Sequence, residues 1–181
     1  LPIVLASTTS KHNRFEKIED VVSFAKSHPK EVSMATTAVG GAYWVAAQMV
    51  EDALEVEFLQ IPQEGSAGFV VKAVAGGHTD LGVSSFASAK GMIEAGKIRF
   101  LTIAGPQRYP GKYNNVKTMK ELGYDASMST FTAVLGPPNI PSEIVSKLSG
   151  AIQKALKDPE VSKGIIARNS IPEYMSPEEF L

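Results

Sequence analysis

Hydrophobic residues follow two patterns along the chain, one with the period of a helix and one with the short runs of a strand. From Phe15 onward, apolar side chains recur every three or four positions, which predicts a helix that ends at Pro29. The same period predicts further helices at residues 45–53, 66–75, 87–95 and 144–156. Short apolar runs predict strands at residues 1–6, 31–35, 56–61, 80–84, 98–104 and 131–135. We expect Pro62 to end the strand at residues 56–61.

The order of these elements indicates the fold class. Strands that alternate with helices are typical of an α/β fold, in which a mainly parallel sheet is covered by helices. Asp158 and Pro159 are expected to end the long helix and to start the next one, and Ser-Pro-Glu-Glu at 176–179 has the form of a capping box. The first predicted strand begins at residue 1, and the last predicted helix begins only a few residues before residue 181. We therefore expect the sequence to be part of a longer polypeptide.

Composition and charge narrow the function. The 181 residues are 44% hydrophobic and 20% charged, with a net charge of -1, which is a globular composition without a basic footprint for nucleic acid. The apolar runs are far shorter than the roughly 18 residues of a membrane span. Cysteine is absent. We therefore expect no nucleic-acid partner, no membrane-embedded segment and no thiol chemistry.

No set of residues in the sequence predicts catalysis. Residues 91–97 read G-M-I-E-A-G-K, but Ile98 replaces the hydroxyl residue of a phosphate loop, and the segment ends a helix where a phosphate loop would start one. His12, His28 and His78 lie far apart without carboxylates at metal-ligand spacing. We predict no catalytic residue, no cofactor and no metal site. Solvated positions in helices are expected for the acidic pairs at 19–20, 51–52 and 178–179.

One loop has features of an anion site. A-T-T-A-V-G-G-A at 35–42 follows a predicted strand and opens a predicted helix, so the unpaired N–H groups of the first helical turn point into it. Gly40 and Gly41 allow close approach of a ligand to the backbone, and Thr36 and Thr37 add hydroxyl donors. A threonine cap beside a tight glycine turn explains the same residues equally well.

Six motifs in order resemble one protein family. They are T-T-A-V-G-G at 36–41, I-P-Q-E-G at 61–65, G-G-H-T-D at 76–80, A-G-K-I-R-F-L at 95–101, P-S-E-I-V-S-K-L at 141–148 and D-P-E-V at 158–161. This series is similar to that of the extracytoplasmic solute receptors of tripartite tricarboxylate transporters, the TctC or Bug family. The resemblance extends from about Leu5 to the end of the chain.

The resemblance implies a periplasmic binding protein of the type II architecture, whose two α/β lobes hold a small organic carboxylate between them. Residues 5–130 would form the second, ligand-binding lobe, and residues 131–181 would return to the first lobe. The family also implies membrane transporter subunits as partners, a periplasmic location and a signal peptide upstream of Leu1. It implies no enzymatic activity and no cofactor.

The family comparison also supplies the predicted ligand site. The first part of this site is the loop that matches the family's S-S-G-V-G-S motif: Thr36, Thr37, Ala38, Val39, Gly40 and Gly41. The second part is Ser84 and Ser85, which stand where the family often has an aspartate. Ala38, Trp44 and Glu64 depart from the family pattern, so the identity of the carboxylate is not predicted. Two other functions remain open: a small α/β enzyme acting on an acidic metabolite, and the effector-sensing domain of a transcription regulator.

Overall fold

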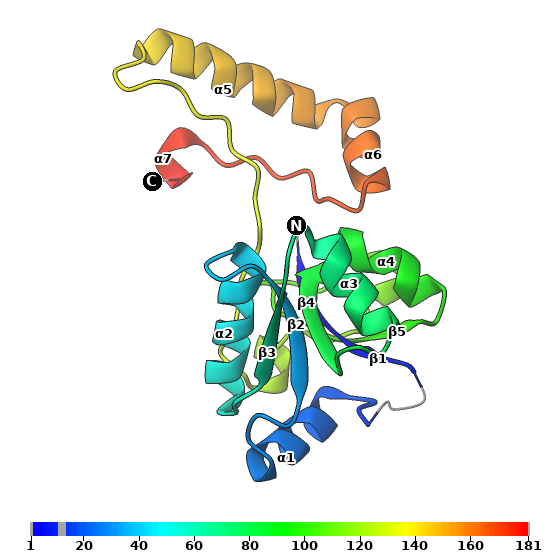
Figure 1. Ribbon diagram of the computed structural model, residues 1–181. Helices are drawn as coiled ribbons and strands as arrows, with labels where there is room; N and C mark the ends of the chain where they lie inside the picture. Colours follow the sequence, from blue (N-terminus) through cyan, green and yellow to red (C-terminus); the bar gives the residue numbers. More distant parts are fainter. Residues whose placement is uncertain (1, 11–13, 181) are drawn as a thin grey trace. The chain divides into compact units, whose positions relative to one another are not determined.

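The computed structural model describes residues 2–10 and 14–180, and they divide into two compact units, residues 2–130 and residues 131–180. The first unit is a sheet with helices on both faces (Figure 1). Its strands are β1 (Ile3–Thr8), β2 (Ser33–Thr37), β3 (Leu59–Gln63), β4 (Leu81–Ser85) and β5 (Ile98–Ile103). Its α-helices are α1 (Ile18–Ser27), α2 (Ala42–Leu54), α3 (Ala67–Ala75) and α4 (Phe86–Glu94). The predicted helices and the first five predicted strands are therefore present, within a few residues of the expected bounds.

The five strands form one mixed sheet in the order β3-β2-β4-β1-β5. β2 is parallel to both β3 and β4, whereas β1 is antiparallel to both β4 and β5. β5 therefore points the same way as β4, and β1 alone runs against the other four strands. The predicted α/β class is confirmed, and β1 is inserted between β4 and β5.

Alternation along β1 explains why this strand is apolar throughout. Ile3 and Leu5 belong to a core cluster with residues of α1 and α2, whereas Val4 and Ala6 belong to a cluster with residues of α3 and α4. Successive side chains of a strand point to opposite faces of a sheet, so a strand covered on both sides must be apolar at every position. Both faces of the sheet are thus buried, by α1 and α2 on one side and by α3 and α4 on the other.

Pro62 does not end β3, contrary to the prediction. It lies within β3, opposite Thr36 of β2, because β3 is an edge strand in which the missing N–H group costs no ladder hydrogen bond. The edge at β5 is different, since the backbone of residues 117–119 continues along it. Ile103 donates its N–H to the Lys117 carbonyl, and Met119 donates its N–H to the Ile103 carbonyl.

A charged contact orders the segment that follows β5. Arg108 Nε lies 2.8 and 2.9 Å from the two carboxylate oxygens of Glu121, and the Thr118 N–H donates to the same carboxylate at 2.9 Å. The hydrogen bond from Arg108 makes the largest contribution to lowering the pKa of Glu121, and the hydrogen bond from the Thr118 N–H makes the next largest. The pKa of Glu121 is lowered to about 2. This segment includes two short 3-10 helices, η1 (Gly111–Tyr113) and η2 (Lys120–Leu122).

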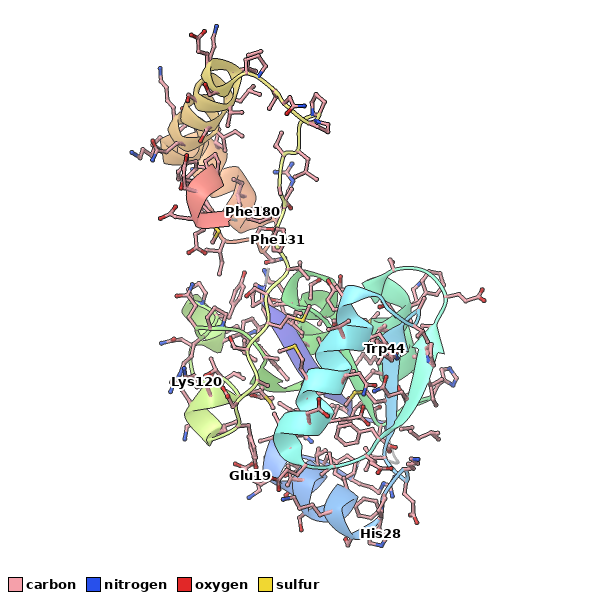
Figure 2. The ribbon with its side chains drawn as sticks, turned by 90° about the vertical axis from the view of Figure 1, so that its left-hand side faces the viewer. Glu19, His28, Trp44, Lys120, Phe131 and Phe180 are labelled. Carbon is pink, nitrogen blue, oxygen red and sulfur yellow. The ribbon has the colours of Figure 1, made fainter. Side chains whose placement is uncertain are left out.

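The second unit consists of helices and extended chain. Its helices are α5 (Ser142–Lys157), α6 (Pro159–Ala167) and α7 (Pro177–Phe180). Asp158 caps α6 by accepting from the N–H groups of Glu160 and Val161, and Ser176 and Glu179 form the predicted capping box at α7. The rings of Phe131 and Phe180 meet edge to face, with centroids 5.0 Å apart (Figure 2).

The predicted strand at residues 131–135 is wrong. These residues form no strand, and Phe131, Val134 and Leu135 are 72–84% exposed. An apolar run becomes a strand only where a neighbouring strand pairs with its backbone, and the described part of this unit contains none. Neither unit, over residues 2–10 and 14–180, has a helix with the length and hydropathy that crossing a bilayer requires.

Candidate functional site

Three helices begin beside one pocket at the carboxyl ends of β2, β3 and β4. The pocket has a volume of about 510 Å³ and lies entirely in the first unit. It is lined by Thr37, Ala38, Gly41, Ala42, Tyr43, Gly65, Ser66, Ala67 and Ser88. These residues come from the connection between β2 and α2, the start of α3 and the first turn of α4. In open α/β sheets, the carboxyl edge of the strands is the usual position of a ligand.

The connection between β2 and α2 has the predicted form. Gly40 has φ +81°, which favours glycine, and the N–H of Gly41 donates to the Ala38 carbonyl at 2.9 Å. A Cβ atom on Gly41 would lie 2.8 Å from Thr37 Oγ1 and 3.0 Å from the Ala38 carbonyl oxygen. Gly41 is therefore required for close approach between the loop and the end of β2, and Gly40 is required for its backbone conformation.

The two threonines of the loop differ in their hydrogen bonds. Thr36 is fully buried and donates its hydroxyl to the Thr37 carbonyl at 3.1 Å. Thr37 lines the pocket, and its buried hydroxyl oxygen has no hydrogen-bond partner within residues 2–10 and 14–180. A buried hydroxyl without a partner is unfavourable, so a ligand oxygen that paired with Thr37 would remove that cost.

Ser84 and Ser85 are buried and do not line the pocket. Ser85 caps α4: its Oγ accepts from the Ser88 N–H at 3.2 Å and lies 2.9 Å from Ser88 Oγ. Ser84 Oγ is 3.4 Å from the Ser85 carbonyl oxygen. Of these three serines, the one that lines the pocket is therefore Ser88, about one helical turn after Ser85.

The predicted loop residues occupy two kinds of position. Thr37, Ala38 and Gly41 line the pocket, whereas Thr36 lies in the core. Val39 is 70% exposed, and Gly40 is exposed beside it. The structure therefore brings part of the predicted set together with the starts of α3 and α4, which are distant in the sequence.

No charged side chain is among the described residues that line the pocket. All nine lining residues are neutral, and within the described chain no side chain caps the first turn of α2, whose N-cap is Gly41. The starts of α2, α3 and α4 each carry a partial positive charge from backbone N–H groups. The pocket therefore favours an anion through N–H and O–H donors instead of a lysine or arginine.

A second depression, of about 600 Å³, lies near the other end of α2 and has the opposite chemistry. Its lining includes Lys26 and four carboxylates, those of Glu51, Asp52, Glu55 and Glu57. Lys26 pairs with Glu55 at 3.5 Å, but most of the charge here is negative. An anion would be repelled from this depression, so its larger volume does not make it the better site.

Glu51 corrects one prediction. We expected both members of the 51–52 pair to be solvated, but Glu51 is only 8% exposed. Burial raises the pKa of the Glu51 carboxyl, and hydrogen bonds from the Phe58 N–H and the Gln60 amide oppose that rise. Glu51 therefore joins α2 to β3 and has a structural role.

The other motifs have ordinary structural positions. Residues 91–97 end α4, where Gly96 has φ +66° and the Lys97 N–H donates to the Met92 carbonyl, as in a helix C-cap. His28 stacks on Phe24, with centroids 4.2 Å apart, and His78 follows the end of α3. His12 lies outside the described residues.

Sequence reasoning missed six of the nine lining residues: Ala42, Tyr43, Gly65, Ser66, Ala67 and Ser88. Gly65 and Ser66 carried a usable signal, because Ser66 is the N-cap of α3 and Gly65 has φ +103°. No local pattern points to Tyr43 or Ser88. Their proximity to Thr37 depends on the order of the strands.

Comparisons with known proteins agree with this architecture. The model of the tripartite tricarboxylate transporter family receptor, TctC, matches residues 2–179. A Pseudomonas sp. protein, the UPF0065 protein in the tcbD-tcbE intergenic region, is 27% identical over 97% of this chain and 56% of its own length. R. palustris Rpa4515, solved with adipate, superposes with a TM-score of 0.83 at 23% identity over 99% of this chain and 59% of that one. MatC from Rhodopseudomonas palustris, solved with bound malate, gives a TM-score of 0.77 at 22% identity over 98% and 59%.

These matches differ in the conclusions that they support. The two structural likenesses, both below 25% identity, show the fold. The chain spans little more than half the length of each of these three relatives.

Proposed function

The chain belongs to the TctC family of tripartite tricarboxylate transporter receptors, and from this premise we propose that it binds a small organic carboxylate at the pocket beside α2, α3 and α4. Proteins of this family are solute-binding receptors and not enzymes. The observation that carries the proposal is the meeting of three helix starts around the Thr37 hydroxyl, which has no hydrogen-bond partner among the described residues. A carboxylate is an acceptor with two oxygens, and this pocket offers only neutral donors to it.

The proposed ligand class rests on both the pocket and the relatives. Adipate and malate, which occur in two related structures, are dicarboxylates of six and four carbons. A pocket of about 510 Å³ has room for a molecule of that size together with water. Binding of this kind changes the balance between open and closed forms of a receptor, and requires no chemical step.

The two units have different proposed roles. Residues 5–130 act as the ligand-binding lobe, which contains the whole pocket. Residues 131–181 contribute to a first lobe, and the supporting observation is that residues 131–180 bury no side chain among themselves. The proposed partners are the membrane subunits of a tripartite transporter, and the proposed location is extracytoplasmic.

The test uses two neighbouring threonines, of which one lines the pocket and the other lies in the core. Thr37→Val removes a hydroxyl that is buried and unpaired without ligand, so the free protein should be as stable as the wild type or slightly more stable. Affinity for the carboxylate should fall by roughly 1–2 kcal/mol, about tenfold, because one donor is lost. Thr36→Val is the control: its hydroxyl is already bonded to the Thr37 carbonyl, so stability should fall.

The measurements are calorimetric titration and thermal unfolding of the complete encoded polypeptide. Malate, adipate and longer or shorter dicarboxylates form the panel. The proposal is wrong if no member of the panel binds the wild type, or if Thr37→Val lowers stability and leaves affinity unchanged.

A further inference from the structure

Among the described residues that line the pocket, Tyr43 alone has a large side chain. The other eight are glycine, alanine, serine or threonine. Side chains of that size do not extend across a pocket of about 510 Å³. Of the described lining residues, Tyr43 is therefore the one whose side chain is long enough to limit the space next to the donors.

Tyr43 also contacts the hydrophobic core. Tyr43 is the second residue of α2, it is partly buried, and it packs against the core cluster formed by β1, β2, β4, α1 and α2. A tyrosine has only two side-chain torsions, so little entropy is lost when its ring forms part of a binding surface. Packing against the core and the small number of torsions leave the ring few alternative positions.

We propose that Tyr43 selects the length of the bound carboxylate, an inference that rests on the proposed carboxylate-binding function. One carboxylate of the ligand meets the N–H and O–H donors around Thr37 and Ser88, and the remainder of the molecule lies against the Tyr43 ring. A short ligand gains contact with the ring, whereas a longer ligand must pass it. Shape complementarity of this kind changes affinity by tenfold or more for each methylene group in a well-fitted apolar pocket.

The experiment measures how affinity depends on ligand length. Straight-chain dicarboxylates from three to eight carbons are titrated into the complete encoded polypeptide and into its Tyr43→Ala and Tyr43→Trp variants. Tyr43→Ala should move the tightest binding to a longer ligand and change the ratio of the six-carbon to the four-carbon affinity by about fivefold or more. Tyr43→Trp should change the same ratio in the opposite direction.

Two controls separate size from other effects. Tyr43→Phe keeps the ring and should keep the length preference of the wild type. Trp44 is the next residue of α2 and is not among the residues that line the pocket (Figure 2). Trp44→Phe should therefore also keep the length preference of the wild type. If Tyr43→Ala does not fold, the opposite shift expected for Tyr43→Trp still decides the question.

The possible results separate this inference from the proposed function. Opposite shifts in the two variants support the selective role of Tyr43. Wild-type binding with the same length preference in folded Tyr43→Ala and Tyr43→Trp overturns the inference and leaves the proposed function standing. Complete loss of binding in both folded variants also overturns it, because the ring would then be an anchor. Absence of binding to every dicarboxylate by the wild type overturns both.

Discussion

Helices α2 and α5 carry the same kind of apolar pattern but differ in what their apolar residues contact. In α2, Ala46, Val50 and Leu54 are at most 1% exposed and face the sheet. In α5, Ile144, Leu148 and Ile152 are 38–49% exposed. Helical periodicity thus specifies a helix and the side that needs cover, and it does not specify the partner that supplies the cover.

The difference extends to the two units as wholes. Residues 2–130 bury both faces of a sheet, and fully burying one leucine side chain contributes about 1.5–3 kcal/mol. Residues 131–180 contain no buried residue, so little apolar area offsets the entropy that these helices lose on folding. We therefore expect the two units to respond differently to the same perturbation.

The largest difference should follow from separating the units. A polypeptide of residues 2–130 should unfold cooperatively, because it keeps both core clusters. A peptide of residues 131–180 should lose most of its helix, since isolated helices of about 16 residues are marginal in water. Far-ultraviolet circular dichroism with urea titration measures both. A strongly helical, cooperatively unfolding 131–180 peptide would contradict the comparison.

Two matched leucines sharpen the comparison inside the intact chain. Leu54→Ala in α2 should reduce the free energy of unfolding by about 2–5 kcal/mol, because it leaves a cavity in the core. Leu148→Ala in α5 should change it by less than about 1 kcal/mol, since that side chain is 49% exposed. Urea midpoints of the two variants provide the measurement. Equal losses would indicate that α5 is covered as fully as α2.

The smallest expected effect concerns pH and acts on the first unit. The pKa of Glu121 is lowered from 4.5 to about 2 in the folded protein, first by Arg108 and then by Thr118. A lowered folded-state pKa gives stability that is present above the unfolded value and is lost as pH falls. The loss should occur between about pH 4.5 and pH 2, and Glu121→Gln should lack this part of the pH dependence.

Carbon-13 titration of the side-chain carboxyl follows Glu121 directly. Glu179 in the second unit offers a reference, because the Ser176 N–H also lowers its pKa. If Glu121 titrates at an ordinary value, the contact with Arg108 is not maintained in solution.

The order of elements was readable from local pattern. Helical period, the cap at Asp158, the capping box at 176–179 and the helix end at Gly96 all depend on residues within a few positions of one another. The predicted turn after β2 belongs to the same class, because a strand, two glycines and a helix follow each other directly. Hydrogen bonds between near neighbours leave a signature in a short stretch of sequence.

Errors arose where a distant partner was decisive. Pro62 is compatible with β3 because β3 lies at an edge, and residues 131–135 are apolar without a strand to pair with. Glu51 is buried because Phe58 and Gln60 donate to its carboxylate. In each case the local pattern predicted one structure, and the position of another segment of the chain led to a different one.

In the pocket, too, some features follow from local sequence and others depend on distant segments. Local sequence is sufficient to place a donor-rich turn at Thr37 to Gly41, since unpaired N–H groups follow from the start of any helix. Only the strand order β3-β2-β4 places the starts of α3 and α4 beside that turn, and with them Ser66 and Ser88. Tyr43 enters the pocket for the same reason, because a side chain lines a cavity only when other elements enclose it. Chain direction and capping are local properties of a polypeptide, whereas enclosure requires the packing of segments that are far apart in sequence.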